Sequence, residues 1–162
     1  MTGVNVRKAC TGDVPAIHRL LEHYADLGVV LRRSEEDILY YLANFSVVET
    51  PDGVCGCAAV RDFGNDLLEV RSLVISPALQ GRGLGKELMR RVIARVDADR
   101  TSWRLFTLTK EPAFFSKLGF AVVEREMFPE KIWSDCRNCP KHNCCDEVAL
   151  ILNCDDYRAC SH

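Results

Sequence analysis

The sequence predicts an α/β (α+β) fold, with helices flanking a mixed and mostly antiparallel sheet. Three features predict it. Successive β-rich runs in the first half are separated by turn residues at Pro51-Asp52-Gly53 and Gly64-Asn65-Asp66, as in an antiparallel meander. Helical patterns lie before and after this meander, and apolar strand patterns return in the second half. We expect one domain, residues 1–162, which is long enough to bury a substantial core.

The individual elements follow from local signals, taken in chain order. Asp13 is expected to cap the first helix, and Ser34, with Asp37 three residues later, is expected to cap the second. Gly119 is expected to end the last predicted helix. The predicted elements are strand 4–8, a helix from the cap to residue 26, helix 35–44, strands 45–49, 54–61 and 67–75, helix 83–96, strand 104–109, helix 112–118, and strands 120–123 and 148–153.

Composition excludes several classes of protein. Hydrophobic residues make up 48% of the chain and charged residues 27%, which excludes an intrinsically disordered protein. The formal net charge of −2 gives no electrostatic reason to expect nucleic acid or an anionic membrane as a partner, so we expect a small-molecule substrate. The sequence shows neither an apolar core of signal-peptide type nor a stretch of the ~20 apolar residues that span a bilayer. We therefore expect a cytoplasmic protein.

The nine cysteines are an odd number in a chain without an export signal, which favours reduced thiols over a disulfide framework. Four of them, Cys136, Cys139, Cys144 and Cys145, lie close together with His142 between them. Their spacing is compatible with a tetrahedral zinc site, but the second pair is adjacent rather than separated by two residues. Buried or redox-sensitive thiols are the preferred interpretation, and no metal is predicted.

A glycine-rich turn joins the predicted strand 67–75 to the helix that follows it. Gly81, Gly83 and Gly85 stand at alternate positions, where they allow the backbone to approach an anion closely. The N–H groups at the start of the helix, with roughly half a positive charge from the helix dipole, favour a phosphate group there. Two known phosphate loops do not fit, because a dinucleotide fingerprint needs glycine at Lys86 and a Walker A loop needs Ser or Thr at Glu87.

The pattern Gln80-x-x-Gly83-x-Gly85 after a strand resembles the acetyl-CoA pyrophosphate loop of the GNAT superfamily of N-acetyltransferases. The segment Phe114 to Phe120, FFSKLGF, is similar to the FYxKxGF segment of the same superfamily. This resemblance implies the GNAT fold, with a sheet splayed between its fourth and fifth strands, and acetyl-CoA as cosubstrate. The implied cofactor-binding residues are Leu73, Val74, Ile75, Gln80, Gly81, Arg82, Gly83, Leu84, Gly85, Lys86 and Phe115. The alternative for Arg82 and Lys86 is that they are surface cations with no role in binding.

The resemblance also suggests a catalytic base. Glu69 precedes Leu73 and Ile75 in the spacing ExxxLxI, in which the strand glutamate serves as base in several members of the superfamily. A base is needed because most substrate amine is protonated at neutral pH. The alternative is a solvent-facing glutamate. Strand alternation places Glu69 and Arg71 on one face with Leu73 and Ile75, so Arg71 either binds a substrate carboxylate or pairs with Glu69. Phe115 replaces the tyrosine that many members use as proton donor.

Several segments resemble one branch of the superfamily, the short bacterial N-acetylglutamate synthases of arginine biosynthesis. They include Leu31 to Ser34, residues 69–73, residues 105–109, and the tail from Pro129, which is part of the cysteine-bearing segment 129–147. The implied reaction is direct acetyl transfer to the α-amino group of L-glutamate. Glutamate has two carboxylates, and the cations that would bind them at matching positions are Arg33, Arg71 and Lys131. The alternative for each of the three is a solvated or salt-bridged cation without a role in binding. Other acceptor amines, a non-catalytic acyl-CoA or metal sensor, and a homodimer all remain open.

Overall fold

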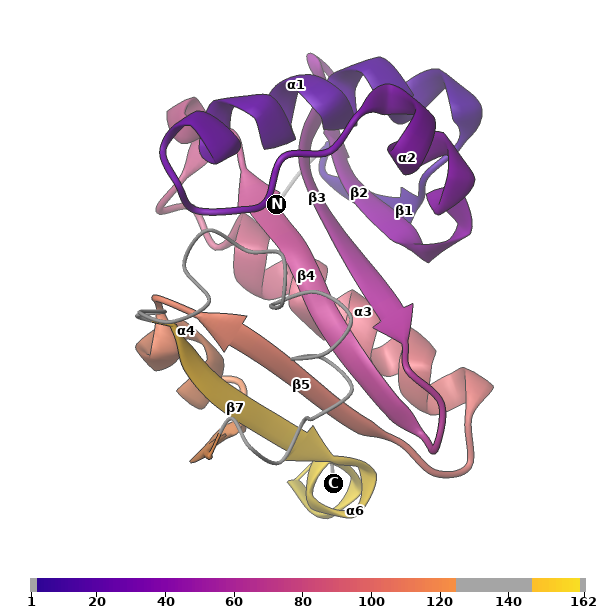
Figure 1. Ribbon diagram of the computed structural model, residues 1–162, viewed down its shortest axis with the longest axis vertical. Helices are drawn as coiled ribbons and strands as arrows, with labels where there is room; N and C mark the ends of the chain where they lie inside the picture. Colours follow the sequence, from indigo (N-terminus) through magenta and orange to yellow (C-terminus); the bar gives the residue numbers. More distant parts are fainter. Residues whose placement is uncertain (1–2, 125–146, 161–162) are drawn as a thin grey trace. The chain divides into compact units, whose positions relative to one another are not determined.

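The structure is a computed structural model that describes residues 3–124 and 147–160. Seven strands form one sheet in the order β1-β2-β3-β4-β5-β7-β6, with helices flanking it (Figure 1). The chain divides into two compact units, residues 1–61 with 70–99 and residues 62–69 with 100–162. Strand β4 (Leu67–Ile75) contributes its first three residues to the second unit and the rest to the first. The prediction of a single domain over residues 1–162 stays a prediction.

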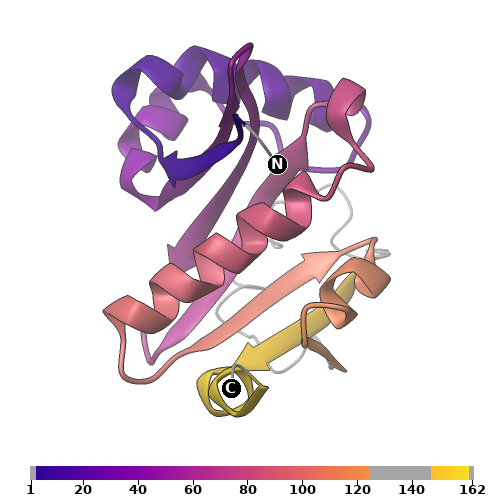
Figure 2. The ribbon, with the colours of Figure 1, turned by 180° about the vertical axis from the view of Figure 1, so that it is seen from behind.

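The first unit is built from four neighbouring strands and three helices. Its strands β1 and β2, and β2 and β3, pair antiparallel, as predicted for the meander. Helices α1 and α2 cover one face of these strands, and α3 covers the other (Figures 1 and 2). Its elements are β1 (Asn5–Lys8), α1 (Val14–Asp26), α2 (Glu35–Tyr40), β2 (Phe45–Thr50), β3 (Gly53–Asp62), β4 (Leu67–Ile75) and α3 (Leu84–Asp99), with 3-10 turns at Thr11–Asp13, Leu42–Asn44 and Pro77–Leu79.

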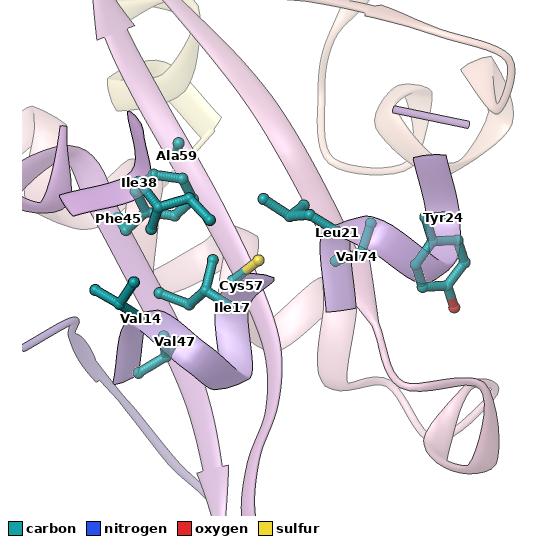
Figure 3. Close-up of a cluster of buried hydrophobic side chains, with 10 residues drawn as sticks. All are labelled: Val14, Ile17, Leu21, Tyr24, Ile38, Phe45, Val47, Cys57, Ala59 and Val74. Atoms are coloured by element: carbon teal, nitrogen blue, oxygen red, sulfur yellow. The ribbon is translucent and has the colours of Figure 1, made fainter. Parts of the chain in front are cut away.

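Two apolar clusters hold the first unit together, one on each face of its strands. Val74 of β4 packs with the apolar stripe of α1, in which Ile17 and Leu21 are completely buried (Figure 3). Leu73 and Ile75 pack instead with the apolar residues of α3. Burying an aliphatic side chain of this size stabilises a fold by about 1.5–3 kcal/mol. The end of β4 is therefore fixed by helices on both faces.

The second unit has its own core. Strand β5 pairs parallel with the first three residues of β4 and antiparallel with β7, which in turn pairs with β6. Leu67, Phe106, Ala149 and Ile151 form its buried cluster. Its other elements are β5 (Arg104–Thr109), α4 (Pro112–Ser116), β6 (Ala121–Val123), β7 (Val148–Asn153) and α6 (Cys154–Cys160). The mixed sheet is confirmed, whereas the predicted splay between β4 and β5 stays a prediction.

Most predicted elements are confirmed to within one or two residues, but helix α3 ends at Asp99, three residues later than predicted. The second helix ends at Tyr40, earlier than predicted, and a separate 3-10 turn follows it. Ser34 caps this helix as predicted, because its hydroxyl accepts from the backbone N–H of Asp37 at 3.1 Å. Helix α6 was not predicted. It is fixed by tertiary contacts with Trp103, whose carbonyl accepts from the N–H of Cys154 at 3.1 Å.

Asp13 does not cap α1, and that prediction is wrong. No capping bond is made by its side chain to the helix that follows. Its carboxylate accepts instead from the backbone N–H of Cys10 at 2.8 Å and binds both terminal nitrogens of Arg7, at 2.8 and 3.0 Å. Arg7 also binds Glu49 of β2. The carboxylate therefore joins β1 to the turn before α1 rather than starting the helix.

This arrangement predicts a loss of stability in acid. The hydrogen bonds from Arg7, and less strongly that from Cys10, lower the pKa of Asp13 from 3.8 to about 2. Because the folded-state pKa is below the unfolded one, the stabilisation is present above about pH 4 and is lost as the pH falls towards 2. We expect a loss of about 2 kcal/mol in the free energy of unfolding over this range. Urea titrations of the parent and of Asp13→Asn at several pH values would measure it.

Glu49→Gln is the control for this prediction. Glu49 binds the same arginine, but its side chain is 42% exposed, so solvent screens the interaction. Asp13→Asn should therefore lower stability at pH 7 more than Glu49→Gln does, and it should remove the acid-dependent component. An acid dependence that persists unchanged in Asp13→Asn would contradict the assignment.

Ser72 interrupts the regular strand geometry on which the face alternation predicted for β4 depends. This residue lies in the left-handed region, with a φ of +54°. A left-handed residue inside a strand shifts the two-residue alternation, as in a β-bulge. Beyond it the alternation holds, since Leu73 and Ile75 pack on one face and Val74 on the other. A common face of Glu69 with Leu73 and Ile75 stays a prediction.

Candidate functional site

The glycine-rich turn predicted from the sequence connects the end of β4 to α3 in the first unit. A short 3-10 turn leads to Gln80, whose backbone is extended, and α3 begins at Leu84. Gly81 and Gly83 between them have φ values of +81° and +78°, which favour glycine strongly. A Cβ atom built on either glycine would meet no atom within 4 Å. Their peptide groups are therefore open to a ligand, as the sequence predicts for an anion-binding loop.

Helix α3 adds its N-terminus to this loop. It has 16 residues and is anchored at its first turn by Leu84, which is buried with Leu88 against the strands. Its first N–H groups are the positive end of the helix dipole and attract a phosphate group. Arg82 and Lys86 are exposed at this end, and neither forms an ion pair within the described part of the chain. Both cations can therefore turn towards an anion at the loop.

Gln80 is exposed, yet its side-chain amide binds the body of the first unit, which the sequence did not predict. Its Nε2 atom donates to the hydroxyl of Tyr24 and lies 3.4 Å from the carbonyl oxygen of Ile75. The hydroxyl of Tyr24 donates to the same carbonyl. Tyr24 belongs to the apolar stripe of α1, so its burial could be read from the helical spacing. The partner of its hydroxyl had no sequence signal.

The left-handed residue Ser72 lies next to the strand segment predicted to bind the pantetheine. Its carbonyl oxygen accepts from the thiol of Cys57 of β3, at 3.5 Å between Sγ and O. Complete burial raises the pKa of Cys57 to about 12, so this thiol stays protonated and donates at neutral pH. Leu73 and Ile75 follow directly. The role of their amides and that of Val74 in binding the pantetheine stays a prediction.

Glu69 lies in the second unit, on the part of β4 that pairs with β5 opposite Phe106. It is only 2% exposed, so the alternative of a solvent-facing glutamate is wrong. A buried carboxylate at a strand position is retained only when polar groups compensate its desolvation. This burial sets Glu69 apart from the surface acids of the chain and keeps it as the candidate base.

Phe115 also lies in the second unit, on α4. Its ring is 4% exposed and packs edge-on against Phe114 and Phe120, with ring centroids 5.1 and 5.3 Å apart. This side chain has no hydroxyl group and cannot donate a proton, as expected from the sequence. Its contact with the cofactor stays a prediction.

Arg33, a candidate for binding the substrate, is a partly neutralised cation. Its Nε donates to Asp37 at 2.7 Å, and its guanidinium lies 5.6 Å from the ring centre of Tyr41 and 5.3 Å from that of Phe45. The salt-bridged alternative is therefore present in the structure. One edge of the guanidinium is bound by Asp37, while the stacking fixes its plane. Its charge also acts on the thiol of Cys57.

The structure divides the predicted site residues among three groups. The first unit contains the loop residues, the segment Leu73 to Ile75, and both Arg33 and Arg71. The second unit contains Glu69 and Phe115. Lys131 and the cysteines from Cys136 to Cys145 lie outside the described residues. Within residues 3–124 and 147–160, no group of three His, Cys, Asp or Glu side chains is placed to hold a metal, and no helix is long and apolar enough to cross a membrane.

Comparison with known proteins places this architecture in a family. A protein-family model described as the acetyltransferase (GNAT) domain matches residues 41–122. The chain is 37% identical over 146 residues to an uncharacterized N-acetyltransferase of Chlorobaculum tepidum, a match that covers 90% of this chain and 94% of that protein. It is 34% identical over 137 residues to the amino-acid acetyltransferase of Mycobacterium tuberculosis, covering 82% of this chain and 78% of that protein.

A solved structure agrees with these matches. The N-acetylglutamate synthase from Neisseria gonorrhoeae, complexed with coenzyme A and N-acetyl-glutamate, superposes with a TM-score of 0.83 at 29% sequence identity. The match covers 94% of this chain and 35% of that longer chain. The family match, the two relatives and the shared fold agree with the loop found between β4 and α3. This chain is an acetyltransferase and belongs to the GNAT family.

Proposed function

We propose that this chain transfers the acetyl group of acetyl-CoA to the α-amino group of L-glutamate, the reaction that begins arginine biosynthesis in bacteria. The observation that carries the proposal is the loop formed by Gly81 and Gly83 at the start of α3. Its two left-handed glycines leave open space where side chains would stand, at the positive end of a long helix. That donor set fits a diphosphate, the group that acetyl-CoA presents between its nucleotide and its pantetheine arm.

Each predicted residue has a distinct task in this proposal. The loop from Gln80 to Lys86 binds the diphosphate, with Arg82 and Lys86 adding positive charge. The amides of residues 73–75 bind the pantetheine and polarise the thioester carbonyl, as an oxyanion site does. Acetyl-CoA supplies an acetyl group activated as a thioester.

Glu69 is the proposed base for the acceptor amine, acting directly or through one water. It accepts the proton that the amine loses as the new N–C bond forms and the C–S bond breaks. The leaving thiol has an intrinsic pKa of about 8.5, so a proton donor helps only modestly. Phe115 provides none, and we propose that solvent takes this role.

The choice of glutamate rests on charge and on the relatives. Arg33 and Arg71 belong to the same unit. Cys57 connects them: its thiol feels the charge of Arg33 and donates to the carbonyl of Ser72, which follows Arg71 in the chain. Two guanidinium groups suit an acceptor with two carboxylates. The similarity to an amino-acid acetyltransferase at 34% identity and to a synthase structure with bound N-acetyl-glutamate supports the same choice. Lys131 stays a third candidate for binding a substrate carboxylate. The cytoplasmic location expected from the sequence also stays a prediction.

A different acceptor amine is the second candidate. Asp37 already binds Arg33, which leaves that cation less able to balance a substrate carboxylate. A small amine with one carboxylate, or an amine on a peptide, would need fewer cations than glutamate does. The relative with 37% identity is named only as an N-acetyltransferase, which is compatible with either acceptor.

A steady-state assay of thiol release separates these candidates. We expect kcat/KM for L-glutamate to exceed that for aspartate, glutamine, lysine and a short peptide by at least about tenfold, a difference of 1.4 kcal/mol in transition-state binding. Arg33→Gln should raise the KM for glutamate much more than that for an uncharged amine. Arg19→Gln, on the exposed side of α1, is the matched control. Equal rates with all amines would contradict glutamate as the substrate, and no turnover with any amine would favour a non-catalytic acyl-CoA sensor.

A further inference from the structure

The hydroxyl of Tyr24 lies where three elements of the first unit meet. Tyr24 comes from the last turns of α1, Ile75 is the last residue of β4, and Gln80 begins the glycine-rich loop. The hydroxyl donates to the carbonyl oxygen of Ile75 and accepts from Nε2 of Gln80. One hydroxyl group therefore connects α1, β4 and the loop.

The directions of these bonds follow from the chemistry of the groups. The carbonyl oxygen of Ile75 can only accept hydrogen bonds. The Tyr24 hydroxyl and the atom of the Gln80 side-chain amide that lies nearer to this oxygen must therefore both be donors. Nε2 of Gln80 lies 3.4 Å from this carbonyl, which fixes the orientation of the amide. The single proton of the Tyr24 hydroxyl is therefore used by Ile75, and that hydroxyl is not placed to donate to a leaving group.

The ring of Tyr24 is held firmly. The residue is 7% exposed and packs in the cluster that includes Leu21 and Val74, at one end of the side chains drawn in Figure 3, where its hydroxyl oxygen points away from the others. The ring of His23 packs edge-on against it, with centroids 5.0 Å apart. Burial raises the pKa of Tyr24, so its hydroxyl stays protonated over the working range of the enzyme.

The loop needs such an anchor. Gly81 and Gly83 have no side chains to restrict them, and a flexible loop loses conformational freedom when it binds a ligand. On its far side the loop is fixed by Leu84, the first residue of α3, which is buried against the strands. On its near side the side chain of Gln80 binds the body of the unit, through the Tyr24 hydroxyl and the Ile75 carbonyl.

We propose that Tyr24 is a positioning residue for acetyl-CoA, which presets the loop by holding Gln80. This inference rests on the proposed function of the loop. It assigns no chemistry to Tyr24, which acts through Gln80 on the affinity for the cosubstrate. The same bond gives Gln80 a role that its place in the glycine pattern does not reveal, because its side-chain amide ties the start of the loop to Tyr24 and Ile75.

Tyr24→Phe tests the proposal, because it removes one oxygen and keeps the ring in the core. We expect the KM for acetyl-CoA to rise about tenfold, the effect of losing a partly buried hydrogen-bonded anchor, while kcat at saturation stays within about twofold. The basic limb of the pH profile of kcat should stay unchanged. An unchanged KM would overturn the proposal. A lower kcat with a lost basic limb would also overturn it, since that result identifies a proton donor.

A double-mutant cycle shows whether Tyr24 acts through Gln80. Gln80→Leu alone should raise the KM for acetyl-CoA by a similar factor, and adding Tyr24→Phe to it should raise it little further. Fully multiplicative effects would contradict the shared mechanism. Tyr40→Phe is the matched control, since Tyr40 is 80% exposed on α2 and should change neither constant. Circular dichroism and thermal midpoints of all variants would show that the fold is kept.

The two proposals fail in different ways. Calorimetric titration of the parent with coenzyme A reports on the loop itself. If the parent does not bind coenzyme A, the function proposed for the loop is wrong. If the parent binds it and Tyr24→Phe binds it equally well, only the role of Tyr24 is wrong.

Discussion

Replacing Glu69 with glutamine is expected to lower kcat by about 10² to 10⁴, the usual contribution of a general base, with little change in the KM for acetyl-CoA. Glutamine has nearly the same shape but cannot accept the proton of the acceptor amine at neutral pH. Glu69 is only 2% exposed, so an isosteric replacement preserves the packing better than alanine would. Steady-state thiol release at saturating acetyl-CoA and glutamate measures the effect.

The pH dependence gives this prediction a second readout. Without a base, the reaction depends on amine that is already deprotonated, and this fraction rises with pH. The deficit of Glu69→Gln should therefore shrink as the pH is raised from 7 towards 10. Glu36→Gln, which changes an exposed glutamate in the first turn of α2, is the control and should behave as the parent. Turnover of Glu69→Gln within about threefold of the parent at pH 7 would exclude Glu69 as the base, since a base contributes far more.

Gly83→Ala is expected to raise the KM for acetyl-CoA by at least about tenfold, or 1.4 kcal/mol of binding free energy. The φ of +78° at Gly83 is costly for any residue with a Cβ atom, so alanine moves the peptide groups that face the diphosphate. The added methyl group would also stand in the open space of the loop. Because the loop binds the cosubstrate before and during the transfer alike, kcat at saturation should change little.

Gly64→Ala is a closely matched control for this variant. Gly64 has a φ of +84°, and a Cβ atom there would also meet nothing within 4 Å, but it lies in the turn between β3 and β4. Both variants should lose about 1 kcal/mol of stability from backbone strain. Only Gly83→Ala should lose affinity for acetyl-CoA. Equal KM values for both variants would remove the loop from the binding site.

The sequence was informative wherever local patterns determine structure. The β-rich runs at residues 67–75 and 104–109 located β4 and β5 to the residue, and the glycine pattern located a loop whose conformation Gly81 and Gly83 confirm. Backbone conformation that only glycine adopts easily can be inferred from glycine itself. The GNAT family was also inferred from these patterns, and the comparisons confirm it.

Features that depend on tertiary contacts could not be predicted. Ser72 is a left-handed residue inside β4 without a glycine to mark it, so this interruption of the strand had no sequence signal. The partners of the Asp13 carboxylate and of the Tyr24 hydroxyl come from segments distant in the chain. The ion pair between Arg33 and Asp37 is local, with a spacing of four residues, but Arg33 precedes α2 and its partner was not predicted.

Calorimetric titration with acetyl-CoA and with S-acetylpantetheine, which lacks the nucleotide and its phosphates, tests most directly whether the loop from Gln80 to Lys86 binds the diphosphate. The parent should bind acetyl-CoA at one site per chain, and at least about 100-fold more tightly than acetylpantetheine, a difference of about 2.7 kcal/mol. Gly83→Ala should weaken only the binding of acetyl-CoA. Equal affinities of the parent for the two ligands, or no binding of acetyl-CoA at all, would contradict the account.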